Sequence, residues 1–174
     1  MTAHPRRGLA AIALALAAGA SAAAGLDLHA DADAADIGVP AYPGAIKKTD
    51  LNGDRAGFSF GVWGDSFGIK VAVVSYRSVD SVDKVAAFYR DALSKYGPVL
   101  DCSANVKKPD GPHTHHDHDD EADKDKPVTC DNDTVEAGGR LYKVGTHRAQ
   151  RVFKAKPWHD GASFELVRVE EHGT

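Results

Sequence analysis

The clearest pattern in the chain is an apolar stripe over residues 81–96, where hydrophobic side chains recur at spacings of three and four. This spacing places side chains on one face of an α-helix. Asp80 is a candidate N-cap for this helix, and Gly97 followed by Pro98 is a typical end. The pattern therefore predicts an amphipathic helix whose apolar face covers a sheet. The stripe consists of Val82, Val85, Ala86, Tyr89, Ala92, Leu93 and Tyr96.

Five other segments are rich in β-branched and aromatic residues, a composition typical of β-strands. The first two flank Gly64-Asp65-Ser66 and predict a hairpin. The last two are joined by a segment that ends in Asp160-Gly161, which is also a hairpin signal. Shorter strand candidates lie at 99–102 and 128–130. The five segments are 58–63, 67–76, 140–145, 150–156 and 162–169.

The order of these elements predicts the fold class. Hairpins dominate, and no repeated β-α-β unit occurs, so we expect an α+β protein. The expected architecture is a mostly antiparallel β-sheet with one amphipathic helix packed on one face. A single domain is expected over residues 37–170.

Two motifs carry a resemblance to known proteins. Tyr42-Pro43-Gly44-Ala45 and the helical segment Phe88–Leu93 resemble a group of uncharacterised bacterial secreted proteins with a Y-P-G-A turn and an F-Y-R-x-x-L helix. The resemblance covers roughly residues 37–101. Its motifs are structural, a turn that Pro43 and Gly44 favour and an amphipathic helix, so it implies a fold and no activity.

Residues 1–22 have the pattern of an export signal. A basic start ending in Arg6-Arg7 precedes an apolar stretch from Gly8 to Gly19, and Ala20-Ser21-Ala22 fits an A-x-A cleavage site. The apolar stretch is shorter than the roughly 20 residues that span a bilayer. We therefore expect a removable signal peptide, no membrane span in the mature chain, and a periplasmic or secreted location. Both the general secretory and the twin-arginine routes remain open.

The composition after the signal limits the partners. Residues 23–36 offer little to bury, so we expect a flexible acidic leader and an ordered domain that begins near Ile37. Removing residues 1–22 leaves 19 basic against 25 acidic residues, which changes the formal net charge from −4 to −6. This acidic excess argues against nucleic acid as a partner.

Cys102 and Cys130 are the two cysteines of the chain. In an exported protein, an even cysteine count predicts a disulfide. The bridge encloses a charged insertion at 107–126 that contains no large apolar side chain, so we expect this insertion to be disordered.

The insertion contains the candidate metal ligands of the chain. Neutral imidazoles and carboxylates are ligands for Zn²⁺, Ni²⁺ or Cu²⁺. The alternative interpretation is a solvated acidic loop that binds metal incidentally. The candidate ligands are His113, His115, His116, His118, Asp117, Asp119 and Asp120.

One sequence match to a catalytic motif is interpreted as a turn. Gly64-Asp65-Ser66-Phe67-Gly68 fits the G-x-S-x-G pattern of serine hydrolases. A nucleophile elbow requires a helix directly after the serine, whereas a β-like segment follows here. We therefore predict no catalytic residue and a small exported non-enzymatic protein, a binding or envelope-associated module. The alternative function is a periplasmic protein that binds divalent transition metals, with Zn²⁺, Ni²⁺ and Cu²⁺ as candidate cofactors.

The metal hypothesis predicts a pH-dependent affinity. Titration of the mature protein with Zn²⁺ should show a dissociation constant that rises as the pH falls through about 6.5, because protonated imidazoles cannot bind the ion. Replacement of all four histidines of residues 113–118 by Gln should abolish binding. Undiminished affinity in that variant would place the metal elsewhere in the chain.

Overall fold

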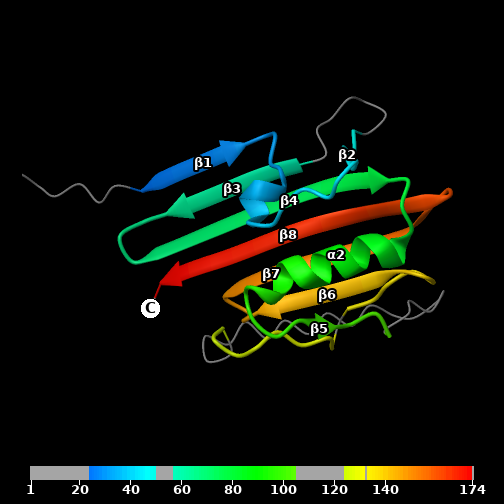
Figure 1. Ribbon diagram of the computed structural model, residues 1–174. Helices are drawn as coiled ribbons and strands as arrows, with labels where there is room; N and C mark the ends of the chain where they lie inside the picture. The colour runs from blue at the N-terminus through cyan, green and yellow to red at the C-terminus, as the bar shows by residue number, and fades with distance from the viewer. Residues whose placement is uncertain (1–23, 50–56, 105–123, 132, 174) are drawn as a thin grey trace, which may run out of the picture.

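The fold is described from a computed structural model, which defines residues 24–49, 57–104, 124–131 and 133–173. Eight strands form one sheet in the order β1-β3-β4-β8-β7-β6-β5, and β2 pairs with β4 beyond the end of β3 (Figure 1). Every pairing between these strands is antiparallel. The strands are β1 (Gly25–His29), β2 (Ile46–Lys47), β3 (Gly57–Trp63), β4 (Phe67–Ser78), β5 (Leu100–Asp101), β6 (Arg140–Gly145), β7 (Ala149–Trp158) and β8 (Gly161–Gly173).

The α+β class with a single helix, expected from the sequence, is wrong. The described part of the chain is mainly β, with eight strands and only two helices, α1 (Ala34–Ile37) of 4 residues and α2 (Val82–Ser94) of 13. Two of the strands, β1 and β2, lie in segments that are too short for a clear alternation. The four residues of α1 are likewise too few to show a helical period.

Both predicted hairpins are confirmed. β3 and β4 pair from Gly57 with Val74 to Trp63 with Gly68, and the turn between them is closed by the Gly64 amide, which donates to the Phe67 carbonyl at 2.7 Å. β7 and β8 form the second hairpin. The weaker segment at 128–130 is not a strand, and a single bridge joins the preceding residue, Pro127, to Thr146.

The core lies between the sheet and the two helices. Figure 1 shows α1 and α2 across the same face of the sheet, with α2 over β6, β7 and β8. Tyr89 and Leu93 of α2 are fully buried against Phe153 and Phe164 of the sheet. The N-cap of α2 is Ser81 rather than the expected Asp80, whose carboxylate instead accepts hydrogen bonds from Tyr42 and Lys84.

Residues before Ile37 belong to the fold, contrary to the expected flexible leader. β1 pairs along its whole length with β3, and Ala32 and Ala34 are only 1% and 2% exposed. Asp33 caps α1 through a capping box with Asp36. Small alanine side chains can be buried at helix starts without any apolar pattern that the sequence would reveal.

α1 is tied to the sheet by two arginines. Arg168 donates to the Asp36 carbonyl and Arg151 donates to the Ile37 carbonyl, at 3.0 and 2.9 Å. Glu170 accepts hydrogen bonds from both guanidinium groups. Burial opposes ionisation of Glu170, but the hydrogen bond from Arg168 and the charges of both arginines outweigh burial and lower the pKa of its carboxyl group.

Truncation of the apolar face of α2 should be costly. Leu93→Ala removes a fully buried side chain and should lower the free energy of unfolding by about 2–5 kcal/mol. Arg90→Ala, on the exposed face of the same helix, should change it by less than about 0.5 kcal/mol. Chemical denaturation of both variants measures the difference. Equal effects at the two positions would contradict the packing.

Loss of the Glu170 carboxylate should destabilise the protein in a pH-dependent way. Because the pKa of Glu170 is lowered in the folded state, its contribution is present at neutral pH and is lost as the pH falls through the folded pKa. Glu170→Gln should therefore lower the free energy of unfolding by roughly 1–3 kcal/mol at pH 7. This difference from the unmodified protein should shrink below about pH 4. Urea denaturation of both proteins at pH 7 and pH 3.5 measures the difference. Asp91→Asn, at an exposed position of α2, is the control and should show no such trend.

Candidate functional site

The sheet has two faces, and both carry apolar side chains. In β4, Ala72, Val74 and Tyr76 point toward the helices and are buried. Successive side chains of a strand point to opposite faces. Ile69, Val71 and Val73 therefore lie on the second face, which is the face that α1 and α2 do not cover.

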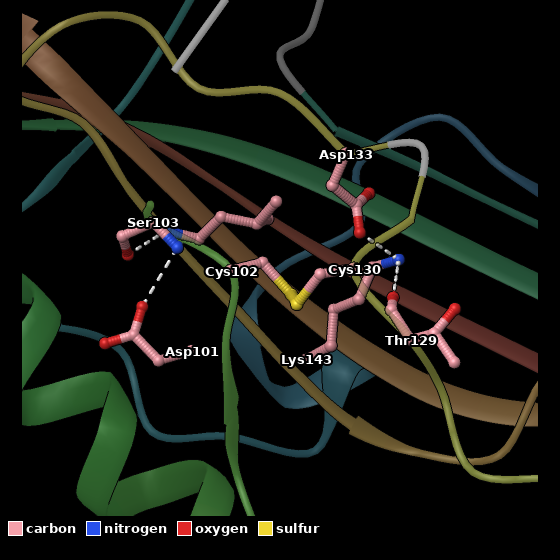
Figure 2. The surroundings of a disulfide bond; sticks show 8 residues. Asp101, Cys102, Ser103, Thr129, Cys130, Asp133 and Lys143 are labelled. Atoms are coloured by element: carbon pink, nitrogen blue, oxygen red, sulfur yellow. Dashed lines mark hydrogen bonds and ion pairs between the residues drawn. A yellow bond between two sulfur atoms is a disulfide. The ribbon is translucent and has the colours of Figure 1, made fainter. Parts of the chain in front are cut away.

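Over β6 and β7, the second face is covered by the segment that the disulfide holds. Cys102 and Cys130 are bonded, with a Cα–Cα distance of 5.4 Å, which confirms the pairing expected from the sequence (Figure 2). The cysteines form a small cluster with Leu141, Val135 and Val152. This cluster is separate from the core beneath α2. The disulfide thus fastens a cover to one half of the second face.

Polar contacts fix the edge of this cover. Figure 2 shows the Lys143 ammonium group of β6 between Thr129 and Asp133, where it donates to the Thr129 carbonyl at 3.1 Å and pairs with the Asp133 carboxylate. On the other side, the Ser103 amide donates to the Asp101 carboxylate, and the Ser103 hydroxyl accepts from the Leu141 amide. Both chain segments next to the disulfide are therefore anchored to β6.

The other half of the second face, over β1, β3, β4 and β8, has no cover among the described residues. Leu26 and Leu28 are 70% and 69% exposed, and Phe58 is 47% exposed. The strand register places the side chains in continuous rows, such as Leu28, Phe60, Val71 and Val169. We call this surface the open face. It comprises Leu26, Leu28, Phe58, Phe60, Val62, Ile69, Val71, Val73, Val167 and Val169.

A polar pocket adjoins one end of the open face. Along β4, the apolar positions are followed on the same face by Ser75 and Arg77. A pocket of about 300 Å³ lies here, lined by residues of β4, β7 and β8 together with Lys48 and Glu136. Lys48, Lys154 and Lys156 are among its lining residues. An extended apolar surface thus ends at a group of cationic side chains.

The predicted metal ligands lie outside the described residues. All seven positions, His113 to Asp120, fall within 105–123, so the metal hypothesis stays a prediction from the sequence. Within the described ranges, no group of three or more histidine, cysteine or acidic residues is placed to hold an ion.

The G-x-S-x-G match lies in the turn of the β3–β4 hairpin, and β4 begins directly after Ser66. This position confirms the turn interpretation.

The last residues of the predicted disordered insertion are part of the described fold. The carbonyls of Lys124 and Lys126 accept hydrogen bonds from the amides of Arg148 and His147, at 2.7 and 3.0 Å. Lys124 also forms an ion pair with Glu171 of β8 at 3.3 Å. The expected boundary at residue 126 is therefore too late. Charged residues at the end of such a tract can be held by backbone hydrogen bonds, for which composition gives no signal.

Comparisons with models of protein families, with curated proteins and with solved structures find no match for this chain. Among the described residues, no helix has the length and apolar character needed to span a membrane.

Proposed function

We propose that the protein is an exported, non-enzymatic binding module that holds an apolar ligand on the open face. The observation that carries this proposal is the set of ten apolar side chains on β1, β3, β4 and β8 that no described element covers. Monomeric soluble proteins rarely expose contiguous apolar patches larger than a few hundred Å² unless the patch binds something.

The rest of the fold supports a binding role for this surface. Two of the four strands that form the open face, β4 and β8, are fixed from behind, because their opposite side chains are packed in the core under α1 and α2. A preformed rigid surface loses little conformational entropy when a ligand binds. The disulfide and the sequence resemblance to secreted proteins support export, since disulfides persist in oxidising compartments.

Binding of a neutral apolar dye, such as Nile red, tests this proposal. The unmodified protein should bind the dye, and the double variant Val71→Thr/Val73→Thr should bind it about tenfold more weakly, which corresponds to ~1.4 kcal/mol. Threonine preserves the shape and the strand preference of valine but adds a hydroxyl group that a ligand would desolvate.

Val79→Thr is the matched control, because Val79 is an exposed valine outside the open face. It should leave the dye affinity unchanged. If the double variant binds as tightly as the unmodified protein, the open face is not the site. If the unmodified protein binds no apolar dye, the proposed function is wrong.

A further inference from the structure

We infer that the ligand of the open face is an anionic single-chain amphiphile, whose carboxylate headgroup is held between Lys48 and Lys154. This inference rests on the proposed function, because it requires that the open face binds an apolar chain. It adds the chemical class of the ligand and the direction in which the ligand lies.

The strand register supplies the direction. On β4, the open-face positions Ile69, Val71 and Val73 are followed at the same spacing by Ser75. A strand rises about 3.4 Å per residue, so the apolar rows extend over ~14 Å and the polar row begins ~7 Å further on. A ligand whose hydrocarbon chain lies along β4 and β8 therefore has one end at the polar pocket. The other end of the ligand lies over the rows of valine and phenylalanine side chains.

The positions of the two lysines follow from the same register. Lys48 follows β2, and its amide donates to the Ser75 carbonyl at 2.8 Å. Ser75 pairs with Glu165 of β8, which in turn pairs with Lys154 of β7. Lys48 and Lys154 therefore lie at the two ends of one row, and both line the pocket. Long lysine stems can bring both ammonium groups toward a headgroup in the middle of the row.

The charges of the pocket favour an anion. Among the described residues, the cationic side chains at this end of the second face are Lys48, Arg77, Lys154 and Lys156. The described carboxylates there are Glu136 and Glu165, so the cations exceed these carboxylates by two, in a chain whose formal net charge is −4.

Two of these four cations already have partners. Lys156 forms an ion pair with Glu136 at 2.8 Å, and the Arg77 guanidinium lies over the Trp158 ring, 4.4 Å from its centroid. Lys48 and Lys154 form no ion pair with another described residue. Glu165 faces the same row and offsets one of the two charges. The carboxylate of a ligand would offset the second positive charge. The pocket therefore matches a headgroup with a single negative charge.

The test compares three amphiphiles with the same chain: dodecanoate, dodecanol and dodecyltrimethylammonium. Each is titrated as a monomer, below the concentration at which it forms micelles, and its affinity is measured by displacement of the neutral dye at low ionic strength. The unmodified protein should bind dodecanoate about tenfold more tightly than dodecanol, and the cationic amphiphile most weakly. The preference for dodecanoate should decrease with added salt, because salt screens exposed charges.

The double variant Lys48→Gln/Lys154→Gln should lose the preference for dodecanoate and keep its affinity for dodecanol. Lys48→Arg/Lys154→Arg should retain the preference, because the charge is kept. Lys70→Gln is the matched control, since Lys70 is an exposed lysine on the same strand but on the opposite face. It should change neither affinity.

The outcomes separate this inference from the proposed function. Equal binding of dodecanoate and dodecanol by the unmodified protein would overturn the anionic headgroup while the apolar site stands. Failure of every amphiphile and of the dye would overturn both. Sedimentation that shows a stable dimer, together with no binding of dodecanoate, would assign the open face to a second copy of the chain and overturn the inference.

Discussion

The pairing of β4 with β8 is the constraint on which the rest of the structure depends. The two strands pair over twelve consecutive positions, from Phe67 with Gly173 to Ser78 with Ala162, and they occupy the middle of the sheet. Both strands carry apolar side chains on both faces. A sheet of this kind is stable in water only if its faces are covered or if exposed apolar surface is tolerated for another reason. The placement of every other element can be understood as a response to this requirement.

The segments that cover the two faces of the sheet are held in place in different ways. On the first face, α2 contributes large apolar side chains to the core, and an ion pair between Asp83 and Arg140 of β6 adds a polar contact. α1 is too short to bury much surface, so Arg151 and Arg168 fasten its C-terminal carbonyls to β7 and β8. On the second face, the cover over β6 and β7 has few apolar side chains, and the disulfide with the Lys143 contacts holds it in place. Smaller covers thus depend on specific polar or covalent links.

The sequence predicts those parts of the fold that rest on a hydrophobic pattern repeated over many residues or on the number of cysteines. α2 follows from a stripe of seven apolar residues, and the disulfide follows from two cysteines in a chain whose first 22 residues have the pattern of an export signal. β1 was missed because Leu26 and Leu28 are only two alternating positions, and α1 because its stability comes from Asp33 and from distant arginines. The open face was missed for a different reason. The run Val71–Val74 indicates apolar side chains on both faces of a strand, but it does not show which face another element covers.

The disulfide also sets where the open face ends. Closure of a loop between residues 28 positions apart lowers the entropy of the unfolded chain and stabilises the fold by roughly 3–4 kcal/mol in the chain-entropy model. That contribution lets the segment around Cys130, which has few apolar residues, remain on the sheet, where it covers Leu141 and Val152. Glu136 of this segment then meets Lys156 at the rim of the polar pocket. The border between the covered and the open half of the face is therefore built from the same segment that supplies one wall of the pocket. A ligand headgroup at Lys154 would lie against the part of the chain that the disulfide positions.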